Sequence, residues 1–314
     1  MGRAVTAALP ERLRAGLSGM MAVVADMIDP AFEVVQPAGS ALPFLFNSPH
    51  SGVVYPRAFV DEARLDFPML RRSEDTLVDA LFADVTRLGM TFMRAHFPRC
   101  YLDVNREPYE LDPRMFEGRL PAYANTRSMR VSGGLGTIAR IVGEAQEIYG
   151  RRIPVDDAIA RIEALYKPYH RTLRQLMVQM QRQFGVAVLV DCHSMPSVCH
   201  RDERSRIDMV IGDRYGTSCA PIIPDIMEAE LRRRGYSVVR NKPYAGGFIT
   251  EHYGNPASGM HAVQIEISRS LYMHEATYCA SEAFENVQRD LIEVARALGK
   301  IPQLELAGVR AAAE

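Results

Sequence analysis

The sequence predicts an α/β protein with a single domain, in which a mixed, largely parallel sheet is flanked by helices. Two observations predict this fold class. Short apolar segments typical of strands alternate with longer amphipathic segments typical of helices. Residues 186–190 read Val-Ala-Val-Leu-Val, as expected of a central strand that is buried on both faces. No internal repeat, low-complexity stretch or clear linker divides the 314 residues, which favours one domain.

The N-terminal third is predicted to hold a helix, two strands and a second helix. Residues 1–30 read as a helical lead-in that ends at Asp29-Pro30. Strands are expected at residues 32–35 and 44–46. Ser73 has the chemistry of an N-cap for the next helix. The apolar residues of that helix recur at helical spacing, namely Leu77, Ala80, Leu81 and Val85.

The middle of the chain is predicted to contain two strands, a long connection and a long helix. The strands are residues 90–97 and 100–104, separated by Pro98. Residues 105–136 are irregular and rich in proline and glycine, and a connection of this length in a compact domain is usually functional. Residues 156–184 follow the pattern of one amphipathic helix, which Pro168 is expected to bend.

Further strands are expected at residues 207–211, 237–240 and 262–267, with helices near 218–234 and 274–298. We place the main domain at residues 31–300, between the lead-in at 1–30 and a tail at 301–314.

The composition is that of an ordinary globular protein. Basic residues number 37 and acidic residues 38, so the near-zero net charge argues against a general nucleic-acid-binding surface. No segment reaches the roughly 20 apolar residues of a membrane span. The five cysteines form no CxxC pair, which favours small buried thiols over a disulfide framework. We therefore expect a cytoplasmic protein without nucleic-acid or membrane partners.

Polar side chains follow several predicted strands. His50 comes after the strand at 44–46, His193 after the strand at 186–190, and Asn105-Arg106 after the strand at 100–104. Glu266 lies inside an apolar strand, where a buried carboxylate without a partner is costly. Ligands of open α/β sheets gather at the carboxyl ends of strands, so we expect these groups to converge.

Two histidines and a carboxylate are the ligand types of a catalytic zinc. The spacing alone does not decide whether a metal binds, because the motifs HExxH, HxxE and CxxC are all absent. A single histidine in a turn is more often a structural hydrogen-bonding group, and Asp191 has the position of a loop cap. The GxSxG elbow, the phosphate-binding P-loop and the dinucleotide-binding GxGxxG context are also missing.

Six short segments occur in an order that resembles the N-formylglutamate amidohydrolase family, over roughly residues 40–300. They are Ser48-Pro49-His50-Ser51-Gly52, Glu74-Asp75-Thr76, Leu102-Asp103-Val104-Asn105-Arg106, Asp191-Cys192-His193-Ser194, Gly246-Gly247-Phe248-Ile249-Thr250 and Gln264-Ile265-Glu266-Ile267. The resemblance implies a phosphorylase/hydrolase-like fold, distantly similar to zinc carboxypeptidases. It implies hydrolysis of N-formyl-L-glutamate to formate and L-glutamate, as in histidine breakdown.

The same resemblance implies the site. One Zn²⁺ per chain would be held by His50, His193 and an acid at Asp75 or Glu74. When the Leu-Phe pair that follows is aligned with that of the family helix, Asp75 falls at the acidic position of the family, which favours Asp75 over Glu74. Glu266 is implied as the general base and Arg106 as the anchor of a substrate carboxylate.

Three further residues are expected to line the substrate pocket, namely Asn105, Gly246 and Gly247, although the glycines have a second explanation as a tight turn. The expected partner is a small acidic N-acyl amino acid. Residues 107–136 match the family least, which makes this stretch the expected place of specificity residues. Two alternatives stay open, a peptidase or amidase for another N-acyl or C-terminal amino acid, and a non-catalytic small-molecule-binding protein of the same fold.

Overall fold

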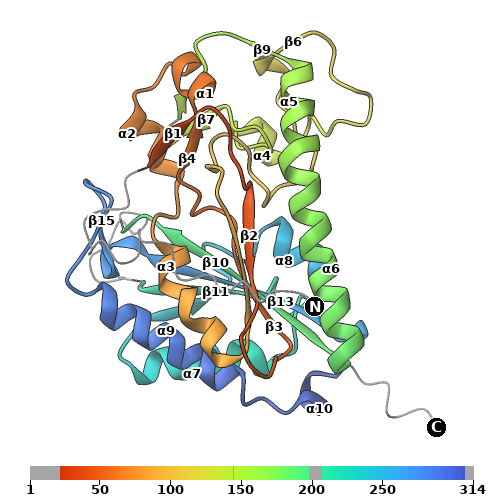
Figure 1. Ribbon diagram of the computed structural model, residues 1–314, viewed down its shortest axis with the longest axis vertical. Helices are drawn as coiled ribbons and strands as arrows, with labels where there is room; N and C mark the ends of the chain where they lie inside the picture. Colours follow the sequence, from red (N-terminus) through yellow and green to blue (C-terminus); the bar gives the residue numbers. More distant parts are fainter. Residues whose placement is uncertain (1–21, 144, 198–206, 308–314) are drawn as a thin grey trace, which may run out of the picture.

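A central sheet of seven strands runs through the structure, a computed structural model that describes residues 22–143, 145–197 and 207–307 (Figure 1). The strand order is β12-β11-β13-β10-β3-β5-β2. Only the β11–β13 and β2–β5 pairs are antiparallel within this sheet. The sheet strands are β2 (Phe32–Val35), β3 (Phe44–Ser48), β5 (Thr91–Ala95), β10 (Ala187–Met195), β11 (Met209–Gly212), β12 (Val238–Arg240) and β13 (Met260–Ser268). The predicted mixed, largely parallel sheet is thus confirmed.

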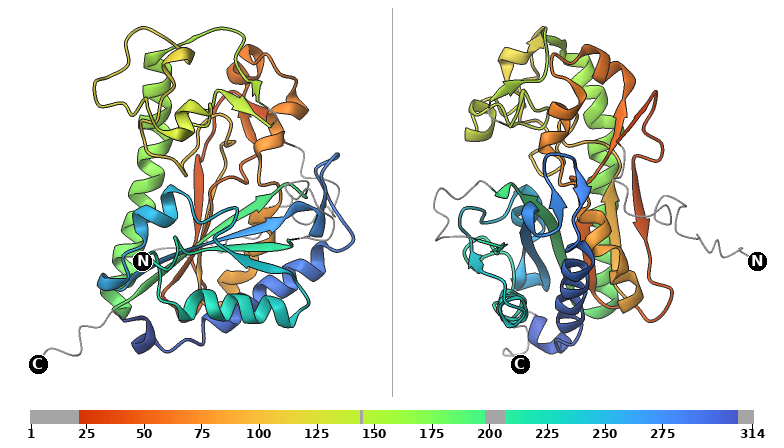
Figure 2. Two further views of the ribbon diagram at one scale, coloured as in Figure 1. Left: turned by 180° about the vertical axis from the view of Figure 1, so that it is seen from behind. Right: turned by 90° about the vertical axis from the view of Figure 1, so that its left-hand side faces the viewer.

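Helices cover both faces of the sheet because its central strands are apolar on both sides. Phe44 and Phe46 of β3 pack in one core cluster with α3 (Val78–Phe82), α7 (Ile222–Arg233) and α9 (Phe284–Leu298). Leu45 points the other way and packs with α6 (Lys167–Phe184) and α8 (Phe248–Tyr253). This alternation follows from the two-residue period of a strand. In Figures 1 and 2, α7 and α9 lie side by side, and α6 runs along a different side of the molecule.

A third core cluster lies beyond the sheet and joins two segments far apart in the sequence (Figure 1). Tyr55 and Phe59 come from the first segment, and Val142 and Ile148 from the second. The short elements of this region are β4 (Val54–Pro56), α1 (Arg57–Glu62), α2 (Phe67–Leu70), β6 (Phe116–Glu117), α4 (Met129–Ser132), β7 (Ile141–Val142), β8 (Gln146–Glu147) and β9 (Ile153–Pro154). The long connection predicted at 105–136 is therefore largely irregular but packed.

Two local predictions were wrong. The described end of the lead-in forms a strand, β1 (Val23–Ala25), which pairs in parallel with β4, and residues 1–21 lie outside the described residues. Residues 100–104 form turns, although their apolar pattern predicts a strand. Leu102 and Val104 are apolar because they are buried in the cluster that contains Leu45.

The helix predicted after Ser73 begins later than expected. Ser73 ends a 3₁₀ turn (Arg71–Ser73), and α3 begins only at Val78. Tertiary hydrogen bonds hold the residues between them: the Asp75 N–H donates to the His50 carbonyl (3.0 Å), and the Ser51 hydroxyl donates to the Asp75 carbonyl (3.0 Å). These bonds keep Asp75 out of the helix and beside His50.

The long helix predicted at 156–184 is confirmed as α5 (Val155–Arg161), a π-helical turn (Ile162–Tyr166) and α6. The π turn ends two residues before Pro168, which has no N–H to donate to the preceding turn. Helix α9 begins ten residues later than predicted, because β14 (Met273–His274) and β15 (Cys279–Ala280) form a small hairpin first. The short helix α10 (Gln303–Leu306) packs Leu306 into the core. Within the described ranges, no helix combines the length and apolar character needed to cross a membrane.

Candidate metal centre

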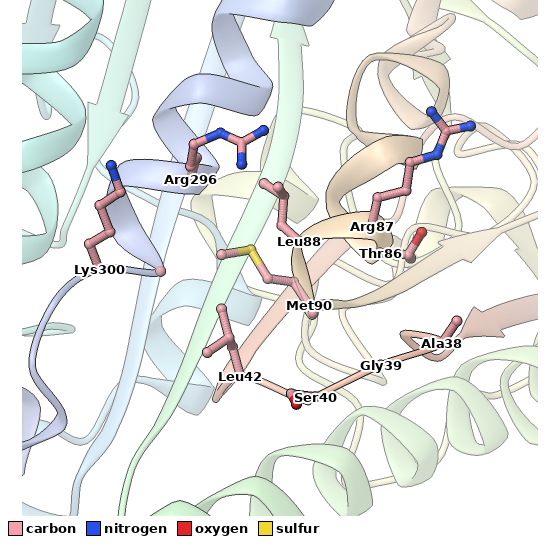
Figure 3. Close-up of a pocket in the computed structure, with 12 residues that line it drawn as sticks. Ala38, Gly39, Ser40, Leu42, Thr86, Arg87, Leu88, Met90, Arg296 and Lys300 are labelled. Atoms are coloured by element: carbon pink, nitrogen blue, oxygen red, sulfur yellow. The ribbon is translucent and has the colours of Figure 1, made fainter.

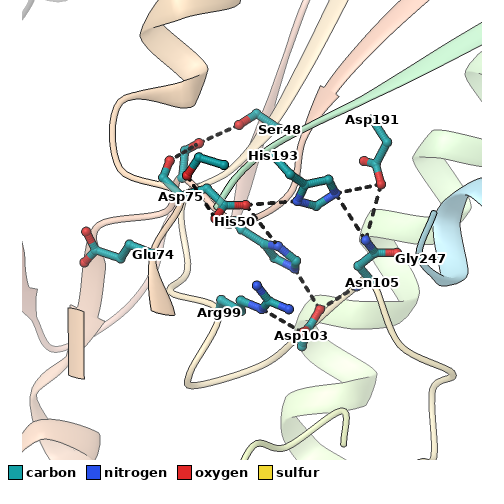
Figure 4. Close-up of polar contacts among 12 residues, drawn as sticks. Ser48, His50, Glu74, Asp75, Arg99, Asp103, Asn105, Asp191, His193 and Gly247 are labelled. Carbon is teal, nitrogen blue, oxygen red and sulfur yellow. Dashed lines mark hydrogen bonds and ion pairs between the residues drawn. The ribbon is translucent and has the colours of Figure 1, made fainter. Parts of the chain in front are cut away.

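Three side chains from separate segments meet at the carboxyl ends of the sheet strands (Figure 4). His50 follows β3, Asp75 lies in the segment before α3, and His193 lies near the end of β10. One ligand atom of each residue lies within 4.8 Å of the others, and all three side chains are buried. The expected convergence at this edge of the sheet is thus found for both histidines.

The two imidazoles turn the same nitrogen toward the same carboxylate. The Nδ1 atom of His193 lies 2.9 Å from Asp75 Oδ2, and the Nδ1 atom of His50 lies 3.4 Å from that oxygen. The opposite nitrogens are paired with other carboxylates. His50 Nε2 lies 2.8 Å from Asp103 Oδ1, and His193 Nε2 lies 2.8 Å from Asp191 Oδ2.

These pairings determine which nitrogens are free to bind a cation. An ionised carboxylate only accepts hydrogen bonds, so an imidazole that binds a cation through Nδ1 keeps its proton on Nε2 and donates it to Asp103 or Asp191. Both Nδ1 atoms face one negative oxygen, and His50 Nδ1 is a buried atom without a hydrogen-bond partner among the described residues. A divalent cation satisfies all three atoms, and carboxylates behind metal-binding histidines are the usual supporting arrangement. The donor set therefore fits zinc.

The electrostatics of the cluster also favour positive charge. Burial is the largest influence on His193 and opposes its charged form, but Asp191 and Asp75 outweigh it and raise the pKa of His193 well above its usual value. Burial likewise opposes ionisation of Asp75, yet His193 and His50 lower the pKa of Asp75. The cluster thus stabilises a carboxylate and a cation together.

Glu74, the alternative to Asp75, points elsewhere (Figure 4). Its carboxylate accepts hydrogen bonds from the Tyr55 hydroxyl (2.6 Å) and from Arg71 Nε (3.0 Å). Asp75 is therefore the acid that faces the histidines.

Glu266 lies on β13 directly opposite His193 in the parallel register. Its Oε1 atom accepts a hydrogen bond from Gln264 Nε2 (2.9 Å). Burial, assisted by the negative charge of Asp75, raises the pKa of Glu266 to about 7. A carboxyl group with this pKa exchanges protons readily at neutral pH.

A cavity of about 500 Å³ opens onto His50, His193 and Glu266. Two carboxylates line it, those of Asp103 and Glu266. Five arginines line it as well, namely Arg72, Arg99, Arg106, Arg130 and Arg269. This excess of positive charge suits an anionic ligand.

A second cavity, of about 450 Å³, lies beside the residues that precede β3 and β5 (Figure 3). Arg87, Arg296 and Lys300 line it. Both arginines are largely exposed and pair with nearby acids, Arg87 with Asp84 and Arg296 with Glu293. It lies at the amino ends of these parallel strands, away from the histidine cluster.

Arg106 lies in the wall of the cavity near the histidine cluster. Its Nε donates to the Leu135 carbonyl (2.9 Å) and its Nη1 to the Asn105 carbonyl (2.8 Å). The Nε atom is also 3.6 Å from Asp103 Oδ2. Burial lowers the pKa of Arg106, and the charges of two neighbouring arginines act in the same direction. An anion in the cavity would offset this cost.

Asn105, Gly246 and Gly247 also line the cavity, and they hold its wall together. The Asn105 amide nitrogen lies 3.3 Å from Asp191 Oδ2, and its oxygen accepts from the Ile249 N–H (2.8 Å). A Cβ at Gly247 would lie 2.4 Å from the Asn105 side chain, so only glycine fits there. Gly246 has φ 115°, a conformation that also requires glycine.

Sequence reasoning missed three supporting side chains. Asp103 and Asp191 stand behind the histidines, and Arg269 stands behind Asp75. Arg269 Nε donates to Ser194 Oγ (3.2 Å), and its Nη2 lies 3.4 Å from Asp75 Oδ1. The two-residue spacing of Asp191 and His193 on one strand was the available signal, because alternate residues share a face.

Comparisons with known proteins identify the family of the chain. The family model described as N-formylglutamate amidohydrolase matches residues 42–273. N-formylglutamate deformylase from Pseudomonas putida is 31% identical over 240 residues, which cover 74% of this chain and 83% of the relative. The deformylase of the same name from Pseudomonas aeruginosa is 28% identical over 277 residues, which cover 85% of this chain and 98% of the relative.

Solved structures support the same fold. The crystal structure of N-formylglutamate amidohydrolase from Ralstonia eutropha JMP134 is 38% identical, with a TM-score of 0.81, and the match covers 86% of this chain and 97% of that one. A protein from Agrobacterium tumefaciens, 21% identical with a TM-score of 0.58, covers 87% of this chain and 95% of its own, and shares the fold.

Proposed function

The chain belongs to the N-formylglutamate amidohydrolase family, and on this premise we propose that it is a metal-dependent hydrolase of N-formyl-L-glutamate. The products are formate and L-glutamate. The observation that carries the proposal is the meeting of His50, Asp75 and His193 beside Glu266 in an arginine-lined cavity.

His50, Asp75 and His193 would hold one zinc ion per chain through Nδ1, Oδ2 and Nδ1. When bound, zinc supplies a water whose pKa is lowered to about 7 and polarises the substrate carbonyl. Asp103 and Asp191 keep both imidazoles in the tautomer that presents Nδ1. Arg269 holds the second oxygen of Asp75, which leaves Oδ2 directed at the histidines.

Glu266 acts as the proton carrier of the reaction. It takes a proton from the attacking water as the oxygen adds to the formyl carbon, and it delivers this proton to the amine nitrogen as the C–N bond breaks. A pKa of about 7 suits both steps, since the carboxyl group must be a base first and an acid afterwards.

Arg106 anchors a carboxylate of the substrate. Its bonds to two backbone carbonyls use Nε and Nη1 and fix the guanidinium plane. Among the described residues Nη2 has no hydrogen-bond acceptor, so it can donate to a carboxylate of the substrate. The cavity of about 500 Å³ is in the range of sites for small molecules. An acidic amino-acid derivative therefore fits both its size and its charge.

Release of the free amino acid by the purified protein, with release of formate from the N-formyl substrates, tests the proposal. We expect N-formyl-L-glutamate to be cleaved faster than N-acetyl-L-glutamate, N-formyl-L-leucine or a dipeptide with C-terminal glutamate. Faster cleavage of the dipeptide would identify a peptidase. Binding of N-formyl-L-glutamate without turnover, in protein loaded with zinc, would identify a binding protein.

A further inference from the structure

The cavity holds more positive charge than one substrate carboxylate requires. Two of its five arginines are engaged with carboxylates of the histidine cluster. Arg99 donates through Nε to Asp103 Oδ2 (3.0 Å), and Arg269 lies 3.4 Å from Asp75 Oδ1. Arg106 is the proposed anchor of one carboxylate. Arg72 and Arg130 also line the cavity and have no role in the mechanism above. Arg72 is exposed, whereas Arg130 is half-buried, and its charge helps to lower the pKa of Arg106.

Arg130 is held in place but keeps its hydrogen-bond donors. It lies in the short helix α4, within the irregular connection, and its side chain is 32% exposed. Its Nη1 atom lies 3.7 Å from Oε2 of the buried Glu110, which is beyond hydrogen-bonding distance. Across the described ranges, its guanidinium makes no hydrogen bond with another side chain or carbonyl. Glu110 therefore orients the guanidinium without occupying it.

One turn of the chain fixes Arg130 relative to Arg106. The Leu135 N–H donates to the Arg130 carbonyl (2.8 Å), and the Leu135 carbonyl accepts from Arg106 Nε (2.9 Å). Arg106 in turn lies 3.6 Å from Asp103, which is bonded to His50. These contacts connect the histidine cluster to Arg106, and Arg106 through Leu135 to Arg130.

We propose that Arg130 binds the side-chain carboxylate of the substrate, while Arg106 binds its α-carboxylate. This inference rests on the proposed function, and it assigns to the chain a preference for N-formyl amino acids with two carboxylates. The α-carboxylate is next to the scissile amide, and the side-chain carboxylate is farther away. Arg106 lies 3.6 Å from Asp103, the partner of His50, whereas Arg130 pairs with Glu110, so we assign the nearer carboxylate to Arg106 and the farther one to Arg130.

The test compares charged and amidated side chains in matched variants. In the Arg130→Gln protein, kcat/KM for N-formyl-L-glutamate should fall about 10- to 100-fold, since a charged hydrogen bond contributes about 1.5–3 kcal/mol. The value for N-formyl-L-glutamine, which lacks the charge, should change less than threefold. Arg127→Gln is the control, because Arg127 lies three residues earlier on the same connection, is exposed and lies outside the cavity lining. In the Arg127→Gln protein, kcat/KM should be unchanged for both substrates.

Binding of the products separates this inference from the proposed function. Wild-type protein should bind L-glutamate more tightly than L-glutamine in calorimetric titration, and Arg130→Gln should abolish the difference. If Arg130→Gln lowers the affinity for L-glutamate and L-glutamine equally, Arg130 has a structural role. If it changes neither affinity, Arg130 does not contact the side-chain carboxylate. If the wild-type protein releases no formate from either substrate, the proposed function is wrong, and the binding preference still decides the role of Arg130.

Discussion

Asp191 and His193 lie two residues apart on β10, and the Oδ2 atom of Asp191 is 2.8 Å from Nε2 of the imidazole. Alternate residues of a strand share a face, so the strand itself brings the two side chains together. Asn47 donates to the other oxygen of Asp191 (2.8 Å) and fixes the carboxylate. The pair holds His193 with Nδ1 directed at Asp75.

This relationship predicts that Asp191→Asn weakens the metal site. The amide no longer selects the tautomer that presents Nδ1, and loss of such a carboxylate typically lowers metal affinity about 10- to 100-fold. Competition with a chelating dye measures the zinc dissociation constant. Asp225→Asn, an exposed aspartate on α7, should retain the wild-type constant. Equal affinity in the Asp191→Asn and wild-type proteins would show that Asp191 does not orient a ligand.

Replacing Glu266 with Gln should separate catalysis from metal binding. The substitution preserves the size of the side chain and its contact with Gln264 but removes the proton carrier. We expect one zinc per chain to remain, while kcat falls by about 10²–10⁴. Elemental analysis and formate release measure the two quantities. Loss of zinc would place Glu266 among the ligands, and normal turnover would leave it a structural role.

Arg106 should be sensitive even to a conservative replacement. Arg106→Lys keeps the positive charge but loses the planar fork, so kcat/KM for N-formyl-L-glutamate should fall. Arg106→Ala should lower it about 10- to 100-fold. Both variants should lose far less on the α-amide of the same substrate. Because Arg106 also bonds the Leu135 carbonyl, thermal unfolding should accompany the kinetics. Equal losses on acid and amide would indicate a purely structural arginine.

The stability of the fold should fall in mild acid because of His170. Burial lowers the pKa of His170 to about 4, against the opposing hydrogen bond to the Val104 carbonyl. The unfolded chain, with a histidine pKa near 6.5, then binds more protons than the folded chain between about pH 4 and 6.5. The contribution of neutral, buried His170 to stability is therefore present above pH 6.5 and is lost as the pH falls toward 4.

Urea unfolding at several pH values measures this dependence. Between pH 6 and 4.5 the free energy of unfolding of the wild-type protein should fall by up to about 1.4 kcal/mol per pH unit more than that of His170→Gln. Equal slopes in the two proteins would show that His170 does not titrate differently on folding.

The sequence predicted the sheet well where burial alone decides the structure. The strands near 44–46, 186–190 and 262–267 are apolar because helices cover both of their faces. The carboxyl ends of parallel strands lie at the same edge of a sheet, which predicted His50 and His193 at one edge. They meet there because β3 and β10 are neighbours, and the pattern alone does not show this.

The errors lie where tertiary contacts override the local pattern. Residues 100–104 are apolar because they are buried, yet they form turns. The segment after Ser73 has helical spacing, but its hydrogen bonds to the His50 loop keep Asp75 outside the helix and at the site. The partnership of Asp103 with His50 spans 53 residues, and no local pattern shows such a contact.

The central claim is that His50, Asp75 and His193 hold the metal on which hydrolysis depends. The most direct measurement is formate release from N-formyl-L-glutamate by chelator-treated protein as zinc is added back. We expect negligible release without metal and a linear rise that ends at about one zinc per chain. Full activity in the metal-free protein, or a rise unrelated to the number of chains, would contradict the account.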